Sequence, residues 1–216
     1  FFQIIFAFYL QCRPDSRDIL TNYPGSRITV RRFRLKLKDP VSGLTHFFGI
    51  ILSIIALAAM IMSSINPIQP WRLLTCTVFG SGMIMLYTAS TLYHWLNLSE
   101  RGNRWLRRFD HMMIFVLIAA TYTPFCLVPM RGPWGWSIFA AVWSLAALGM
   151  LIKIFWMDAP RWLSTGLYVM MGWVAVIGLH PLVESLTPAA LFWVFAGGIF
   201  YTAGALFYVL KRPNCR

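Results

Sequence analysis

The chain has 216 residues, of which 58% are hydrophobic and only 12% are charged. Soluble domains usually carry about 45–50% apolar and about 25% charged residues, so this composition excludes an ordinary soluble enzyme. A disordered chain is excluded too, because disorder requires low hydrophobicity. Nineteen basic and seven acidic residues give a net charge of +12, which in a soluble protein would suggest nucleic-acid binding. Here the basic residues lie between long apolar runs. We therefore interpret the excess of basic residues as a signal that orients the protein in the membrane, and we expect no nucleic-acid partner.

The first part of the chain differs in composition from the rest. An apolar run over residues 1–10 is too short to cross a bilayer as a helix. Positions 31–38 are strongly basic, and a basic flank of this kind sets the topology of the span that follows it. We therefore predict a basic, poorly ordered cytoplasmic segment over residues 1–38 and a single transmembrane helical domain over residues 39–213.

Six apolar stretches follow, each close to the ~20 residues that cross the hydrocarbon layer as a helix. Backbone groups in lipid must be hydrogen-bonded within the protein, and the period-two alternation of a membrane barrel is missing. The fold class is therefore predicted to be all-α, a polytopic bundle of membrane helices. The predicted spans cover residues 43–65, 73–96, 109–128, 136–156, 163–180 and 187–210.

Lysine and arginine residues are concentrated in alternate connections between these spans. They are frequent before the first span, in the 97–108 connection, in the 153–161 region and after the last span, and sparse in the other three connections. Because cytoplasmic loops carry the excess of basic residues, both ends of the chain are predicted to be cytoplasmic. We expect a multi-pass protein of the plasma (inner) membrane.

Polar and ionisable side chains gather at the predicted cytoplasmic edge of the spans. Ser90 and His94 lie four residues apart near the end of the second span, so they share one helical face. Asp110 begins the third span on the same side, and His46 lies near the start of the first, as a packing residue or as an outer group of a site. Ionisable groups at membrane depth are costly and therefore point to function. Since the connection between the second and third spans is short, we expect Ser90, His94 and Asp110 to cluster within about 10 Å.

Two arrangements would use such a cluster. Histidine and carboxylate side chains are ligands of zinc, and catalytic zinc keeps one position open for a water molecule. Zinc lowers the pKa of that water to about 7 and so generates a hydroxide nucleophile. Alternatively, His94 and Asp110 form a structural pair between two helices. The residues alone leave both alternatives open. His111 is expected to meet headgroups or another helix, and His180 to be an interfacial residue.

Taken together, these motifs resemble the hemolysin III family, within the superfamily of progestin and adipoQ receptors. The motif that begins at Asp39 departs from the family only in its first residue, which is usually glutamate. The resemblance extends over about residues 39–213 and rests on these stretches: Asp39–His46, Ser90–His94 of the SxxxH type, Arg107–His111, Thr121–Phe125, Gly197–Ala205 and Lys211–Pro213. It implies seven helices, a cytoplasmic N-terminus and zinc held by three histidines near the cytoplasmic face. It further implies that His94 is a zinc ligand, and that Ser90 and Asp110 flank the metal and its water.

The family's other two histidines belong to an HxxxH motif in a seventh helix, which this sequence does not contain. We therefore expect a chain truncated or frame-disrupted before that helix, with weak or no zinc binding. Without the metal, Asp110 is expected to pair with His94 or with a loop arginine. An open groove lined by Ser90, His94 and Asp110 is expected at the cytoplasmic edge.

The resemblance allows three functions. The first is a zinc-dependent hydrolase of an amide or ester bond in a ceramide-like membrane lipid, with Asp110 transferring the proton and Ser90 orienting the water or the oxyanion. The second is a pore-forming cytolysin, although the spans lack the polar stripe that would line a channel. The third is a membrane-lipid homeostasis or receptor-like protein in which zinc is structural. Membrane lipids are the expected partners, and the formation of a homo-oligomer is left open.

Overall fold

The computed structural model describes residues 37–156 and 160–210. Within these ranges the chain forms seven α-helices and no β-strand, which confirms the predicted all-α class. The predicted N-terminal segment, residues 1–38, lies almost wholly outside the described residues. The helices are α2 (Pro40–Ile65), α3 (Pro70–Trp95), α4 (Glu100–Leu127), α5 (Pro133–Phe155), α6 (Arg161–Ile177), α7 (Leu179–Ser185) and α8 (Pro188–Leu210).

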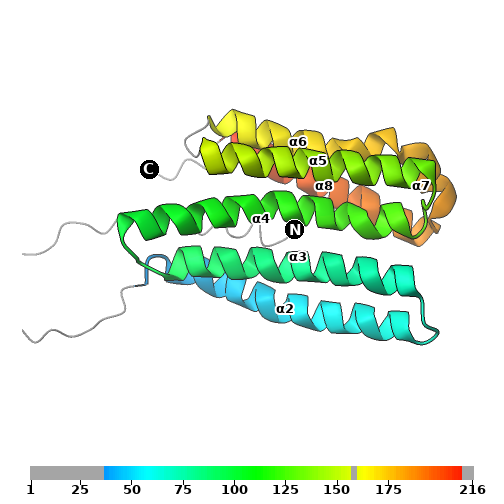
Figure 1. Ribbon diagram of the computed structural model, residues 1–216, viewed down its shortest axis with the longest axis horizontal. Helices are drawn as coiled ribbons and strands as arrows, with labels where there is room; N and C mark the ends of the chain where they lie inside the picture. The colour runs from blue at the N-terminus through cyan, green and yellow to red at the C-terminus, as the bar shows by residue number, and fades with distance from the viewer. Residues whose placement is uncertain (1–36, 157–159, 211–216) are drawn as a thin grey trace, which may run out of the picture.

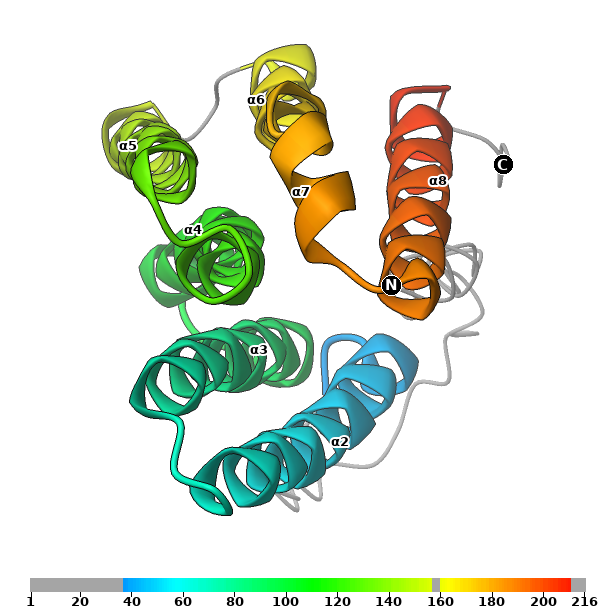
Figure 2. The ribbon, with the colours of Figure 1, turned by 90° about the vertical axis from the view of Figure 1, so that its right-hand side faces the viewer.

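The long helices run along one axis, with α2, α3 and α4 in one half of the bundle and α5, α6 and α8 in the other (Figure 1). Seen end-on, they follow one another around the bundle in chain order, and α7 connects α6 to α8 (Figure 2). Five helices are long and apolar enough to span a membrane, and α6 with α7, bent by 59°, passes the same test as a pair. The protein is therefore a multi-pass membrane protein, with five or six candidate spans in the described residues. The end of the bundle at which α2 begins and α3 ends is called the site end below.

Proline sets the start of four helices. Its missing amide proton has no partner in the first helical turn anyway, so the first position tolerates it. The helices α2, α3 and α5 begin at residues 40, 70 and 133, where the apolar pattern predicted spans from 43, 73 and 136. Each of these helices therefore extends slightly beyond its apolar stretch, back to the nearest proline.

The 97–108 connection, predicted as a loop, is helical from Glu100 onward. Ser99 caps α4, because its hydroxyl accepts a hydrogen bond from the Gly102 amide at 3.3 Å. Asn103 reinforces the start of the helix through two hydrogen bonds with the backbone of Leu98, at 3.2 and 3.0 Å. A helix of 28 residues is about 42 Å long, so α4 extends beyond the hydrocarbon layer. Its basic first turns belong to that extension.

The predicted fifth span is broken. The Tyr122 hydroxyl of α4 donates to the carbonyl oxygens of Met171 and Gly172, at 2.8 and 2.7 Å, and accepts from the Ala175 amide at 3.0 Å. In a regular helix the Ala175 amide would bond to the Met171 carbonyl. Tyr122 thus contacts the backbone of α6 shortly before this helix ends at Ile177, and a side chain inserted at a helix backbone can bend the helix. The connection predicted over residues 180–188 contains α7.

The hydrophobic core lies between α4, α5, α6 and α7. Phe115 and Met171 are among its fully buried side chains. Gly149 of α5 permits the close approach of α4, since a Cβ atom there would lie 2.2 Å from the Phe115 ring. Small residues at helix contacts are the usual way in which membrane helices pack closely.

Candidate functional site

Ser90 and Asp110 face each other across the contact between α3 and α4 at the site end. The Ser90 hydroxyl lies close enough to the Asp110 carboxylate to stabilise its charged form. Both groups are largely buried, with Ser90 5% exposed and the Asp110 side chain 13% exposed. Gly82 allows the two helices to meet closely, because a Cβ atom there would lie 3.0 Å from Cβ of Ala120. The predicted meeting of Ser90 with Asp110 is confirmed.

His94 has a different carboxylate partner, Asp39. The His94 Nδ1 atom lies 3.5 Å from Oδ2 of Asp39, and the Asp39 amide donates a hydrogen bond of 2.8 Å to the His94 carbonyl oxygen. Asp39 also caps α2, since its Oδ1 atom accepts a hydrogen bond of 3.4 Å from the Ser42 amide, and its Oδ2 atom accepts one of 2.7 Å from the Ser42 hydroxyl. One carboxylate therefore joins the beginning of α2 to the end of α3 and orients the His94 ring.

His46 packs on His94. The two imidazole rings are stacked, with centroids 5.5 Å apart and planes 17° apart. Tyr87 lies beside the His46 ring, with 6.2 Å between the two ring centroids. The Nδ1 atom of His46 is buried and has no hydrogen-bond partner. His46 therefore packs on His94, and its role as an outer group of a site stays a prediction.

One expectation about Asp110 is wrong. Its partners are the Ser90 hydroxyl and, at 3.8 Å, Nδ1 of His111, rather than His94 or a loop arginine. The physical reason is that Asp39, directly before α2, lies closer to His94 and takes the place of Asp110 as its partner. The side chains at the three predicted site positions are largely buried, with that of His94 17% exposed and the other two less. The open groove expected there stays a prediction.

The remaining histidines lie where the sequence predicted. His111 meets another helix, because Tyr168 of α6 donates a hydrogen bond to its carbonyl oxygen at 3.3 Å. The His111 ring bonds to the Arg107 carbonyl through Nδ1 at 2.7 Å. His180 lies on α7 with its side chain 84% exposed and 3.6 Å from Glu184.

The described residues fit a zinc site only in part. With Nδ1 of His94 directed at Asp39, the free lone pair is on Nε2, and a carboxylate behind the ring is the usual arrangement for a metal-binding histidine. Within residues 37–156 and 160–210, however, no group of three histidine, cysteine or acidic side chains is arranged to hold a metal ion. One ligand does not make a site, so we assign no chemical step to zinc.

Sequence reasoning missed the part played by Lys38. Its ammonium group lies over the Tyr93 ring, 3.9 Å from the centroid, and its charge acts on both His94 and Asp110. Because Lys38 is the last residue of the basic flank, the sequence predicted only that it helps to orient the first span in the membrane. Its position directly before Asp39 was the signal that could have placed it at the site.

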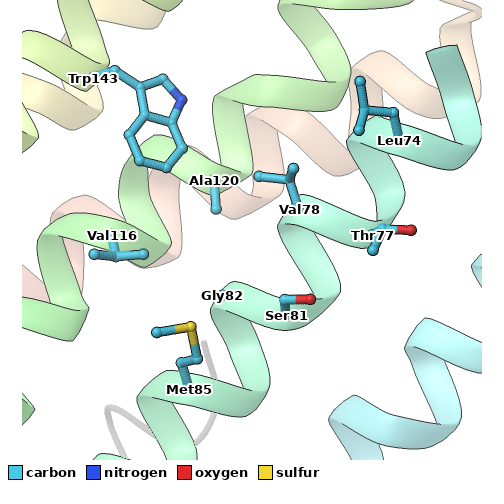
Figure 3. Close-up of a pocket in the computed structure, with 9 residues that line it drawn as sticks. All are labelled: Leu74, Thr77, Val78, Ser81, Gly82, Met85, Val116, Ala120 and Trp143. Carbon is cyan, nitrogen blue, oxygen red and sulfur yellow. The ribbon is translucent and has the colours of Figure 1, made fainter.

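A separate hollow of about 290 Å³ lies on the outer side of the same helix pair. Figure 3 shows Leu74, Val78 and Met85 of α3 along it, with Trp143 of α5 above Ala120 of α4. The Trp143 ring is fixed by a hydrogen bond of 3.2 Å to the Thr123 hydroxyl. Neither Ser90 nor Asp110 lines this hollow, so it is distinct from the polar site.

These observations define a polytopic α-helical membrane protein with a buried Ser90–Asp110 pair beside His94 at one end of the bundle. The chain belongs to the hemolysin III family, because the family model described as "Haemolysin-III related" matches residues 35–216. The Hemolysin-3 homolog of Bacillus subtilis (strain 168) is 40% identical over 175 residues, which cover 81% of this chain and 82% of the relative. Hemolysin-3 of Bacillus cereus is 37% identical over 175 residues, covering 81% and 80% of the two chains.

A more distant relative is the human protein named Monocyte to macrophage differentiation factor. It is 24% identical over 169 residues, which cover 76% of this chain and 68% of the relative. No solved structure shows a significant match.

Proposed function

We propose that the protein hydrolyses an amide or ester bond of a membrane lipid, with Asp110 as general base. The single observation that carries this proposal is the buried contact between Ser90 and the Asp110 carboxylate at the site end. A carboxylate buried near the end of two membrane helices is costly, and proteins keep such groups chiefly for function. Its depth suits the carbonyl group of a lipid, which lies just below the headgroup.

The chemistry follows from the two side chains. Asp110 takes a proton from a water molecule as the oxygen attacks the lipid carbonyl carbon. The bond between that carbon and the leaving nitrogen or oxygen breaks, and Asp110 returns the proton to the leaving group. Ser90 acts as a positioning residue, because its hydroxyl donates to one carboxylate oxygen and leaves the other for water. His94 would be a zinc ligand only if further ligands came from outside the described residues.

A second candidate function comes from the names of the relatives. Two proteins about as long as this chain and 37–40% identical to it carry the name Hemolysin-3. A cytolysin would release the contents of vesicles without breaking lipid bonds. One experiment distinguishes the two candidates.

The purified chain is reconstituted in vesicles made from extracted lipids, and lipid products are followed by mass spectrometry while the release of a trapped dye is recorded. We expect lipid turnover in the wild type and at least a ~100-fold loss in Asp110→Asn, as is typical when general base catalysis is removed. Glu184→Gln, a change at the opposite end of the bundle, is the matched control. Dye release that is unchanged in Asp110→Asn, without lipid turnover in either protein, would favour the cytolysin.

A further inference from the structure

Lys38 places a positive charge at the site end, just before α2 begins. Its ammonium group lies over the Tyr93 ring of α3, 3.9 Å from the ring centroid. Tyr93 in turn meets the His94 ring edge-on, with 5.0 Å between the two centroids. His94 shares a helical face with Ser90, four residues earlier in α3. Two ring contacts therefore connect the Lys38 cation to the polar site.

The position of Lys38 is fixed from two directions. The next residue, Asp39, donates a backbone hydrogen bond of 2.8 Å to the His94 carbonyl oxygen and accepts one of 3.4 Å from the Ser42 amide. At the other end of the side chain, the electron-rich face of the Tyr93 ring attracts the ammonium group. A side chain that is already held in place loses little conformational freedom when it binds a ligand. Lys38 is thus preorganised at the site.

The charge of Lys38 is available to a ligand. The residue is exposed, and within residues 37–156 and 160–210 no carboxylate forms an ion pair with its ammonium group. The neighbouring carboxylate of Asp39 faces His94 instead. A lysine ammonium carries three N–H donors, and an aromatic face attracts the charge without offering a lone pair to them. An anion at this position would therefore find both charge and hydrogen-bond donors.

Along the bundle axis, Lys38 lies nearer the water than the Ser90–Asp110 pair. Ser90 is five residues, or about 7.5 Å, before the end of α3 at Trp95, whereas Lys38 lies outside the helices. The Trp95 indole donates to the Pro40 carbonyl oxygen at 3.4 Å and marks the interface, where membrane proteins concentrate tryptophan. In a glycerophospholipid the phosphate lies on the water side of the acyl carbonyl groups. The protein groups thus follow the same order as the lipid groups.

We propose, on the basis of the lipid hydrolysis proposed above, that the substrate carries a phosphate group and that the Lys38 ammonium binds it. The acyl carbonyl then lies at the Ser90–Asp110 pair. Phosphate oxygens accept charge-assisted hydrogen bonds, and lysine is a usual donor to them. Lys38 takes no part in the bond cleavage, so it determines specificity: it selects phosphate-bearing lipids over neutral lipids.

The test compares phosphatidylglycerol with diacylglycerol that has the same acyl chains. Turnover by the purified protein is measured in uncharged mixed micelles over a range of lipid concentrations. We expect kcat/KM to be about tenfold higher for phosphatidylglycerol, and Lys38→Met to remove this preference mainly by raising KM for phosphatidylglycerol. Lys38→Arg should keep most of the preference, since a guanidinium group also stacks on rings and donates to phosphate.

Two controls separate phosphate binding from other effects of charge. Arg104→Gln removes an exposed cation near the start of α4 and should change the preference less than about twofold. Equal losses in Arg104→Gln and Lys38→Met would indicate general surface attraction and overturn the proposal. The Lys38 charge also acts on His94 and Asp110. If Lys38→Met slowed both lipids equally, the residue would act through these groups alone, and the proposal would again be wrong.

A binding measurement distinguishes failure of this proposal from failure of the proposed hydrolysis. Native mass spectrometry in uncharged detergent compares the binding of the two lipids by the wild type and by Lys38→Met. A preference for phosphatidylglycerol that Lys38→Met loses, without turnover of either lipid, would support the phosphate site and contradict hydrolysis. Turnover of both lipids with equal kcat/KM would support hydrolysis and overturn the phosphate site. Wild-type protein that neither prefers nor cleaves phosphatidylglycerol would overturn both.

Discussion

Asp39 connects the start of α2 to the end of α3 at the site end. Its carboxylate caps α2 and faces His94, while its amide bonds to the His94 carbonyl. The orientation of His94 thus depends on a residue outside the helices. Within the described part of the chain, Asp110 has the Ser90 hydroxyl and the His111 ring as partners, and its carboxylate is able to accept a further hydrogen bond.

We expect Asp39→Ala to lower the free energy of unfolding by about 1–2 kcal/mol, because α2 loses its cap and His94 loses its partner. Asp39→Asn keeps an acceptor for the Ser42 hydroxyl and should cost less than half as much. Chemical unfolding in detergent micelles, followed by circular dichroism, measures both changes. Equal stability of Asp39→Ala and the wild type would show that the cap contributes nothing.

Added zinc should not raise the melting temperature of the 216-residue chain in detergent. The reason is that His94 is the only ligand that the described residues direct at an incomplete site, and binding energy requires the full set of ligands. Thermal unfolding with and without a zinc salt tests this expectation. A zinc-dependent increase that disappears in His94→Ala would contradict it and show that the missing ligands are present elsewhere in the chain.

At the scale of the helices, apolar length and proline positions predicted most of the spans, because lipid selects for uninterrupted apolar residues. Two features escaped this pattern. The start of α4 is polar and is held by the Ser99 cap and the Asn103 hydrogen bonds, which hydropathy does not register. The break after α6 follows directly on the backbone contacts of Tyr122, a residue far away in the sequence.

Tyr122→Phe should straighten the end of α6, because the Ala175 amide is then free to bond directly to the Met171 carbonyl. The loss of the buried hydroxyl contacts should cost about 1 kcal/mol of stability. Electron–electron distance measurements between spin labels at positions 131 and 183, in a cysteine-free background, should record a shifted distance. Tyr93→Phe is the control and should leave the distance unchanged. An unshifted distance in Tyr122→Phe would show that the bend has another cause.

Gly149→Ala should destabilise the protein by about 1–3 kcal/mol, because the added methyl group overlaps the buried Phe115 ring. Gly166→Ala serves as the matched change on α6, since a Cβ atom there meets nothing within 4 Å. It should be neutral or stabilising by up to about 1 kcal/mol, through helix propensity. Thermal unfolding compares the two variants. Equal effects would mean that the contact between α4 and α5 is looser than the structure shows.

For the molecule as a whole, the sequence predicted the layer in which the polar residues meet but not how they pair. Charge alternation and span order placed Ser90, His94 and Asp110 at one end. The partner of His94 is Asp39 and not Asp110, because of the path by which the chain enters α2. Residue spacing in the sequence does not reveal that path. Lys153 was assigned to topology because a basic residue near a helix end usually reaches the surface, whereas here it is buried.

The alternating basic connections predict that the site end is cytoplasmic. In a cysteine-free background, a cysteine at the exposed position 104 should react with a membrane-impermeant reagent only after cells are permeabilised, whereas one at position 131 should react in intact cells. The opposite pattern would invert the orientation and place the Ser90–Asp110 pair at the outer surface.

The central claim is that Ser90 and Asp110 act as one catalytic unit, and a double-mutant cycle on lipid turnover tests it most directly. Side chains that act together lose activity non-additively. We predict that Ser90→Ala and Asp110→Asn each reduce turnover in reconstituted vesicles, and that the double variant is no slower than Asp110→Asn alone. Losses that multiply, or full turnover in Asp110→Asn, would contradict the claim and leave the pair with a structural role.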